Sequence, residues 1–290
     1  MQAGRASITA LRAARSRARH QICDFPPIFE DPVSLKIIGA KTEHELRNMS
    51  PHADSRLARG IRAGLVARSR IAEDELHQAV KRGVRQYVIL GAGLDTFAYR
   101  NPYPASALRV FEVDHPATQA WKRRLLDDAH IPVPESLRFV DIDFESQSLA
   151  GRLKAAGFDA NEPAFFSWLG VTMYLSNDAV MHILKHVASG PAGSGIVFDY
   201  VLDHASRNII GRLFLHGLAY RFARMGEPWI GFFQPRDLAM RMKAMGFTEM
   251  EDIDTEQLNA RFFRHRRDNL RFSEIGLRFA KLGHVMVARV

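Results

Sequence analysis

Cysteine is nearly absent from this chain of 290 residues, because Cys23 stands alone and has no partner for an intramolecular disulfide. A disulfide scaffold is therefore excluded, and so is a zinc site built from cysteines. The sequence also has no His-Glu-x-x-His run, and no apolar stretch approaches the roughly 18 residues that a membrane-spanning helix needs. What remains is 47% hydrophobic and 25% charged, which is typical of a globular protein with enough chain to bury a core.

Acidic residues are missing from positions 1–22, which hold five arginines and so carry +5 of the net charge of +8. The rest of the chain is only mildly basic, whereas a nucleic-acid-binding protein normally has a broad basic face. We therefore expect no nucleic-acid and no membrane partner, and interpret the basic runs as solvated helix faces. An acidic small-molecule substrate is the alternative. Positions 1–22 lack a cleavage site typical of a targeting peptide, so we expect a helix of the fold and a cytoplasmic protein.

Short β-branched and aromatic runs alternate with helical patterns along the chain, which predicts βαβ units and a parallel sheet. Strands are expected at 84–90, 108–113, 137–140, 164–168, 195–199, 247–253 and 284–290. Helices are expected at 66–82 and 149–156, and after Pro116, Ser176 and Pro235. The last two strands lack a long helical crossover, so one strand should be antiparallel. The predicted fold is Rossmann-like α/β, with a seven-stranded, mostly parallel sheet and helices on both faces.

The chain shows no linker-like composition and no internal repeat, so we predict one domain that spans residues 1–290. Within it, residues 1–65 are expected to form an N-terminal helical cover. Residues 203–230 break the regular alternation, and we interpret them as an insertion over the substrate end of the sheet.

Two glycines, Gly91 and Gly93, directly follow the first predicted strand, where they let the backbone pass close to a ligand. A tight strand-to-helix turn is the alternative interpretation. The dinucleotide fingerprint needs a third glycine at position 96, which is Thr96, and the chain has no GxxxxGK[ST] run. A pyrophosphate-bearing cofactor is therefore not expected at these glycines.

Carboxylates end the second and third predicted strands. Glu112 and Asp114 lie on the same side of the second, and either could accept both ribose hydroxyls of an adenosine group. Asp143 could accept the exocyclic amine of adenine while Phe144 packs on the ring. A solvent-facing acid and a helix N-cap are the alternatives. Together with the glycines, these residues predict an adenosine ligand without phosphates, and S-adenosylmethionine is the obvious such cofactor.

Four stretches also carry a family resemblance, namely residues 87–96, 111–118, 140–144 and 170–175. Through them the chain resembles the leucine carboxyl methyltransferase family of class I S-adenosylmethionine-dependent methyltransferases. It is most similar to the bacterial branch with the tetracenomycin-type polyketide O-methyltransferases. The resemblance covers about residues 5–200 and implies S-adenosylmethionine as the cofactor.

The resemblance also implies roles for single residues. Gly91 would line the methionine part of the cofactor, Asp114 would hold the ribose, and the Asp143–Phe144 pair would hold the adenine. Arg68 matches the family arginine that pairs with the cofactor carboxylate, although by itself it would be interpreted as a surface helix charge.

The chain departs from the family at Leu169. Family members often carry a glutamate at this position, immediately before the run at 170–175, where it holds the cofactor amino group. A backbone carbonyl is the alternative contact for that group.

These observations predict an O-methyltransferase that acts on a small, carboxylate- or hydroxyl-bearing molecule and uses no metal. The alternatives are a protein C-terminal carboxyl methyltransferase and a non-catalytic cofactor-binding module. Candidate substrate contacts are Tyr174, Tyr200, His204 and His216, each of which could instead be structural. The sequence leaves the acceptor, any general base and the oligomeric state open.

Overall fold

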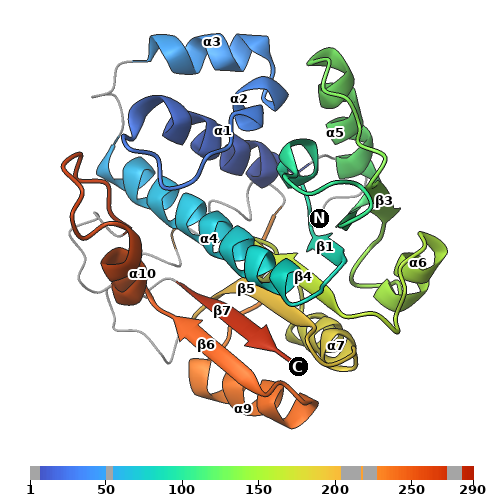
Figure 1. Ribbon diagram of the computed structural model, residues 1–290. Coiled ribbons are helices and arrows are strands. Elements are labelled where there is room, and N and C mark those ends of the chain that lie inside the picture. Colours follow the sequence, from blue (N-terminus) through green and yellow to red (C-terminus); the bar gives the residue numbers. More distant parts are fainter. Residues whose placement is uncertain (1–6, 50–54, 204–216, 218–226, 273–282) are drawn as a thin grey trace.

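A computed structural model describes residues 7–49, 55–203, 217, 227–272 and 283–290 of the chain. Its centre is a seven-stranded sheet of order β3-β2-β1-β4-β5-β7-β6 (Figure 1). The strands are β1 (Gln86–Leu90), β2 (Arg109–Asp114), β3 (Leu137–Asp141), β4 (Ala164–Trp168), β5 (Gly195–Val201), β6 (Glu249–Ile253) and β7 (Gly283–Arg289). Strand β7 is antiparallel to both neighbours, and the other pairs are parallel. The predicted Rossmann-like sheet with one antiparallel strand is thus confirmed.

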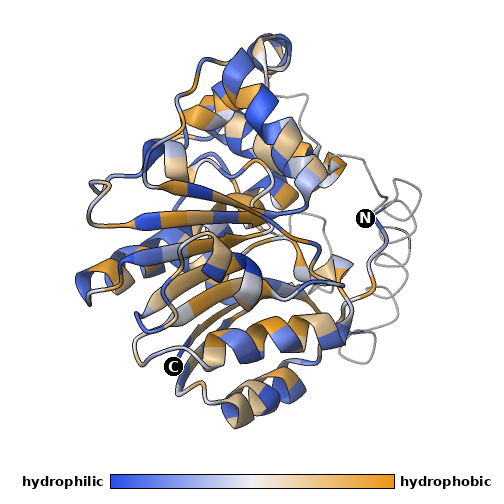
Figure 2. Cartoon of the chain, turned by 90° about the vertical axis from the view of Figure 1, so that its right-hand side faces the viewer, coloured by the Kyte–Doolittle hydropathy of each residue, from blue (hydrophilic) through white to orange (hydrophobic). Residues whose placement is uncertain are grey.

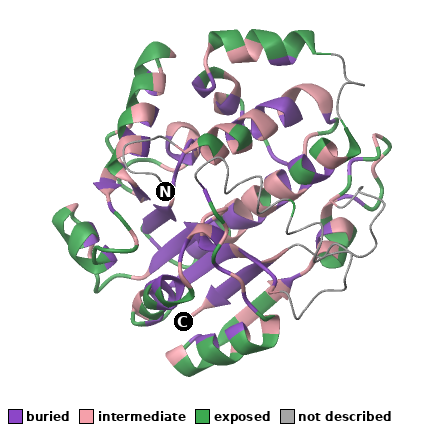
Figure 3. Ribbon diagram, turned by 180° about the vertical axis from the view of Figure 1, so that it is seen from behind, coloured by how far each residue is buried: buried purple, intermediate pink, exposed green. Residues whose placement is uncertain are grey.

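Helices cover both faces of the sheet, as Figure 2 shows from the side. They are α1 (Ile8–Cys23), α2 (Val33–Ile37), α3 (Ala40–Asn48), α4 (Arg56–Lys81), α5 (Pro116–Asp128), α6 (Leu149–Ala155), α7 (Asn177–Ala188), α9 (Pro235–Met245) and α10 (Thr255–Phe262), with the short 3-10 turns η2 (Phe97–Arg100) and η3 (Thr172–Tyr174). One apolar cluster joins the sheet to α6, α7 and α9, and a second joins its other face to α4 and α10. The central strands β1 and β4 are consequently buried along their whole length, whereas the edge strand β6 is partly exposed (Figure 3).

The strand order places β1 between β2 and β4. Strands β2 and β3 therefore extend the sheet on one side of β1, and β4 and β5 extend it on the other. In open α/β sheets, ligands bind outside the carboxyl ends of the strands at such a switch point. The groups singled out in the sequence therefore follow adjacent strands: the glycines follow β1, Asp114 ends β2, and Asp143 comes two residues after β3.

Local sequence signals explain where several helices begin and end. Ser176 accepts a hydrogen bond from Ala179 N and caps α7, as predicted. Pro116 stands at the first turn of α5. Gly246 ends α9 with a φ of 116°, a left-handed conformation that favours glycine.

Helix α4 is longer than predicted. It begins at Arg56 and not at residue 66, with Ser55 as its cap. The extra turns carry Arg62 on their buried side, so hydrophobic periodicity alone did not reveal them. The expected end of the N-terminal cover at residue 65 therefore falls inside one continuous helix. The predicted insertion at 203–230 lies outside the described residues, apart from residues 203, 217 and 227–230.

The N-terminal cover is attached to α4 by a buried polar network. The carboxylate of Asp24 accepts hydrogen bonds from Arg62, at 2.7 and 3.0 Å, and from Nδ1 of His20 at 2.8 Å. The His20 ring accepts at Nε2 from the backbone N–H of Ile28. Burial acts to raise the pKa of Asp24, but the hydrogen bonds from His20 and Arg62 outweigh it and lower the pKa.

A second buried network attaches the cover to the loop after β1. Asp31, which is fully buried, accepts from Nε of Arg17 at 2.9 Å and from the hydroxyl of Thr96 at 2.6 Å. Arg17 also donates to the carbonyl of Leu94 at 2.6 Å. Since Leu94 and Thr96 belong to the segment that begins with Gly91, the cover fixes the backbone beside the candidate site.

A third buried charge pair lies beneath the end of β2. Nζ of Lys122 on α5 is 2.7 Å from Oε2 of Glu112, and both side chains are 1% exposed. Burial raises the pKa of Glu112, and Lys122 only partly offsets this effect. The pair places one carboxylate and one ammonium group in the core, where each depends on the other.

We expect Lys122→Met to lower the free energy of unfolding by about 3–5 kcal/mol, because it leaves the Glu112 carboxyl buried and unpaired. The loss should be larger at pH 8 than at pH 5. In the variant the folded-state pKa of Glu112 lies above its unfolded-state pKa. The free energy of unfolding therefore declines as the pH rises from the unfolded-state pKa through the folded-state pKa. Urea unfolding at both pH values measures the effect, and Glu112→Gln/Lys122→Met is the control that should recover most of it. An equal loss at both pH values would contradict this account.

Candidate functional site

The loop after β1 is built from backbone that leaves no room for side chains. Gly91 has a φ of 65° and Gly93 a φ of 48°, both in the left-handed region. A Cβ on Gly91 would overlap the side chain of Val171, which follows β4, and one on Gly93 would lie 3.0 Å from Ala10 of α1. The loop therefore packs closely between the β4 loop and the N-terminal cover.

Asp114 lies at the end of β2 and joins this loop to its own strand. Its Oδ2 accepts a hydrogen bond from Gly93 N at 2.5 Å, and its Oδ1 accepts one from His115 N at 2.6 Å. Burial raises the pKa of Asp114, while the two backbone N–H groups act to lower it. Because a carboxylate oxygen can accept more than one hydrogen bond, each oxygen keeps the capacity to accept a ligand hydroxyl.

The structure separates the two acids that spacing alone left equivalent. Glu112 lies two residues before the strand end, on the same side as Asp114, and its carboxylate faces Lys122 and the hydroxyl of Tyr99 in the core. Asp114 is at the strand end, beside Gly93. Of the two, Asp114 is the one placed beside the loop.

Asp143 and Phe144 follow β3, as predicted. Asp143 is exposed, and its carboxylate accepts from Glu145 N at 3.1 Å and from the hydroxyl of Ser146 at 3.0 Å. It thus stabilises its own turn, which is the alternative that the sequence left open, and this does not exclude a ligand contact. The Phe144 ring is half-buried, with its centroid 6.2 Å from that of Trp168 at the end of β4.

Arg68 extends from α4 to the ends of β4 and β5 and is mostly buried. Its Nη1 is 2.5 Å from Oδ2 of Asp199, whose Oδ1 accepts from Gly170 N at 2.5 Å. Its Nη2 would lie 2.6 Å from a Cβ on Gly170, whose φ is 75°. Asp199 therefore positions both the guanidinium group and the β4 loop, and Gly170 leaves space for Arg68 beside the strand end.

Tyr174 in η3 follows the end of β4. Its hydroxyl lies close to the side chains of Trp229 and Thr9 and within electrostatic range of Arg68. Burial is the main cause that raises the pKa of Tyr174, so the hydroxyl stays protonated and can donate a hydrogen bond.

The other predicted substrate contacts are placed differently. Tyr200 is 1% exposed, and its hydroxyl is 3.0 Å from both carboxylate oxygens of Asp252. The same carboxylate is 2.9 Å from Nδ1 of His284. His204 and His216 lie outside the described residues.

Two acidic residues of this region, Asp199 and Glu227, were not identified as site residues from the sequence. Asp199 was included only as the last residue of a predicted strand, although an acid at a strand end is the same signal that identified Asp114. Glu227 is 6% exposed and lies in a stretch without periodicity, so its burial could not be predicted from the sequence pattern.

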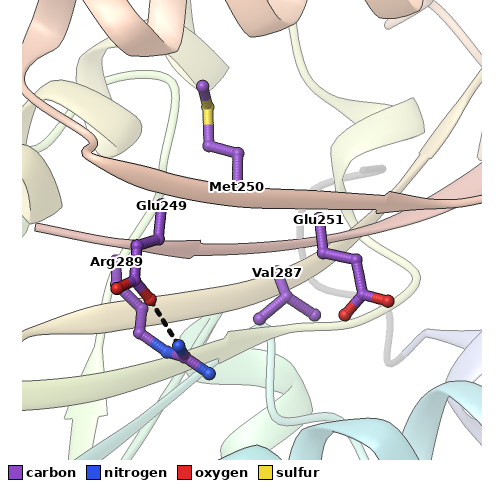
Figure 4. A pocket seen from close by; sticks show the side chains of 5 residues that line it. All are labelled: Glu249, Met250, Glu251, Val287 and Arg289. Carbon is purple, nitrogen blue, oxygen red and sulfur yellow. Dashed lines mark hydrogen bonds and ion pairs between the residues drawn. The ribbon is translucent and has the colours of Figure 1, made fainter.

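A small pocket lies far from these strand ends. It has a volume of about 210 Å³ and lies at the outer side of β6 and β7, where Arg289 forms an ion pair with Glu249 (Figure 4). Arg289 is paired with Gly195, the first residue of β5. The pocket therefore lies near the amino ends of the parallel strands, away from the carboxyl ends that carry the candidate site. Ligand sites usually measure about 300–1,000 Å³, and we assign no role to this pocket.

The fold is Rossmann-like, and comparisons with known proteins show that the class is that of the S-adenosylmethionine-dependent methyltransferases. The leucine carboxyl methyltransferase family matches residues 10–188, and the chain belongs to this family. YktD of Bacillus subtilis (strain 168), provisionally named as an S-adenosyl-L-methionine-dependent methyltransferase, is 32% identical over 93% of this chain and 95% of its own length. A provisionally named methyltransferase of the same class from Frankia alni is 33% identical over 64% of this chain and 65% of its own.

Solved structures support the fold. A DUF574 family protein from Streptomyces avermitilis aligns with a TM-score of 0.55 and 16% identity, covering 94% of this chain and 96% of its own. A provisionally named methyltransferase from Thermobifida fusca aligns with a TM-score of 0.52 and 14% identity, covering 99% and 96%. In the part of the chain that the structure describes, no helix combines the length and apolar character needed to cross a membrane.

The donor set at the strand ends fits S-adenosylmethionine. The cofactor carries two ribose hydroxyls, an adenine ring and a zwitterionic methionine group. The site offers a carboxylate with free acceptor capacity in Asp114, an aromatic ring in Phe144 and a guanidinium group in Arg68. The glycine loop adds backbone that a ligand can approach closely.

We expect Asp114→Asn to weaken S-adenosylmethionine binding by about 10- to 100-fold, the equivalent of losing a charge-assisted hydrogen bond. Isothermal titration calorimetry measures the affinity, and thermal melting verifies that the variant is folded. Asp178→Asn, an exposed acid at the start of α7, is the matched control and should bind like the parent. If parent and Asp114→Asn bind S-adenosylmethionine with equal affinity, Asp114 does not contact the cofactor.

Proposed function

We propose that this methyltransferase transfers the methyl group to an oxygen atom of a small acceptor that carries a carboxylate or a hydroxyl. The observation that carries the proposal is the match over residues 10–188 to a family described by carboxyl methylation. The net charge of +8 supports it, because a basic protein attracts acidic molecules.

In this proposal the cofactor lies across the carboxyl ends of β1 to β4. Asp114 would hold the ribose hydroxyls, Phe144 with Asp143 the adenine, and Arg68 the methionine carboxylate. Gly91 and Gly93 would let the backbone approach the ligand. The cofactor supplies a methyl group bonded to a positively charged sulfur.

The chain itself contributes alignment and the exclusion of water. Methyl transfer is an in-line displacement, for which holding the reactants in position contributes up to about 7–11 kcal/mol. A carboxylate acceptor is already ionised at neutral pH and needs no general base, whereas a hydroxyl acceptor needs one. The Tyr174 hydroxyl, which stays protonated, is suited to donate a hydrogen bond to an acceptor oxygen.

Two other functions are open to test. A protein C-terminal carboxyl methyltransferase would methylate a peptide ending in leucine, as the family description suggests. A non-catalytic module would bind the cofactor without turnover, and the exchange of a charged family residue for Leu169 is the feature that favours it.

We expect methyl transfer from S-adenosylmethionine labelled in its methyl group to members of a panel of small carboxylic acids and phenols. A methyl ester releases labelled methanol in mild alkali, whereas a methyl ether does not, so this treatment identifies the acceptor oxygen. The rate with a carboxylic acid should be flat between pH 6 and 8, because that acceptor does not titrate there.

A peptide with a C-terminal leucine belongs in the same panel, and its preferential labelling would favour the protein methyltransferase. Label on nitrogen or sulfur would contradict the proposal. Cofactor binding without label on any acceptor would favour the non-catalytic module.

A further inference from the structure

Glu227 is a buried carboxylate without a compensating partner. Its side chain is 6% exposed, and Oε2 has no hydrogen-bond partner. No ion pair joins it to any residue in the described parts of the chain. Burying an unpaired carboxylate is costly, so a carboxylate kept in this state needs a cation or donor that the described residues do not supply.

The segment that carries Glu227 is held firmly against η3. The backbone N–H groups of Ile230 and Gly231 donate to the carbonyl of Met173 at 2.8 and 3.1 Å. A Cβ on Gly231 would overlap the carbonyl oxygen of Thr172, so the two backbones touch. Phe233 then bonds with Val201 at the end of β5. These contacts place the segment at the carboxyl ends of β4 and β5.

Two opposite charges act on the hydroxyl of Tyr174 in this region. Beyond the dominant effect of burial, the negative charge of Glu227 raises the pKa of Tyr174 and the positive charge of Arg68 lowers it. The ion-pair partner of Arg68 is Asp199 and not Glu227. Glu227 and Arg68 thus act electrostatically on one hydroxyl and form no ion pair with each other.

The end of β4 supplies no carboxylate of its own. Leu169 packs against the apolar cluster beneath α4, and Gly170 and Val171 are uncharged. Asp114 lies apart, at the end of β2, where it accepts from Gly93 N and His115 N. Near the ends of β4 and β5, Glu227 is a carboxylate with an oxygen that has no hydrogen-bond partner among the described residues.

We propose that Glu227 binds the α-ammonium group of S-adenosylmethionine, next to the carboxylate that Arg68 binds. A separated pair of one guanidinium and one carboxylate complements the two charges of an amino acid. The inference rests on the cofactor site proposed above, and it adds recognition of the ammonium group by a residue far along the chain from the strand-end motifs.

A thermodynamic cycle tests the pair directly. Calorimetry compares parent and Glu227→Gln with S-adenosylhomocysteine and with its analogue that lacks the α-amino group. The substitution should weaken S-adenosylhomocysteine binding by about 10- to 100-fold, as expected for one charge-assisted hydrogen bond. It should leave the deaminated analogue unaffected. The parent should prefer S-adenosylhomocysteine over that analogue by the same factor.

Two further ligands separate this inference from its foundation. 5′-Methylthioadenosine lacks the amino-acid part, so Glu227→Gln should bind it like the parent. If it fails to bind the parent, the proposed adenosine site is wrong, whatever Glu227 does. Glu227→Gln should weaken S-adenosylmethionine binding by the same factor as S-adenosylhomocysteine binding. A much larger loss of affinity for S-adenosylmethionine would assign Glu227 to the sulfonium and overturn the proposal.

Glu249→Gln at the opposite edge of the sheet is the matched control and should bind all ligands like the parent. An equal loss for the aminated and deaminated ligands would overturn the assignment to the ammonium group. Should Glu227→Gln fail to fold, the parent alone remains decisive, because equal affinity for those two ligands would also overturn the proposal.

Discussion

The arrangement of the site depends on the hydrogen bonds and ion pairs that the carboxylate of Asp31 forms. It is fully buried and accepts from Arg17 of α1, from the backbone of Ser34 and from the hydroxyl of Thr96. Arg100 lies 3.4 Å from it and continues the network to Glu73 of α4. One charge thus unites the N-terminal cover, the glycine loop and the longest helix, and the glycine loop in turn bonds to Asp114.

The charged groups of the site are positioned by hydrogen bonds and ion pairs to neighbouring residues. Asp114 is held by two backbone N–H groups and Arg68 by Asp199. Such preorganisation means that little side-chain freedom is lost when a ligand binds. Glu227 is the exception, since one of its oxygens awaits a partner.

Most of the sheet could be predicted from the sequence because the central strands β1, β4 and β5 are short, largely apolar runs. The strand ends therefore gave the positions of Gly91, Asp114 and Asp143 directly. Helix boundaries depended on capping, and Ser176 was recognised whereas Ser55 was not. The missed residues, Asp199 and Glu227, depend on tertiary contacts: what they face is decided by α4 and η3, which lie far away in the sequence.

The attachment of the cover has a consequence for the order in which the protein can assemble. During translation α1 and the loop after it are made before Arg62, Leu94 and Thr96, which bond to Asp24, Arg17 and Asp31 respectively. Within the cover Arg17 can still pair with Asp31 and Asp24 with His20 and Arg62, but the Leu94 carbonyl and the Thr96 hydroxyl are missing until the loop after β1 is made. The cover can therefore complete its docking contacts only after the loop that follows β1 has been synthesised.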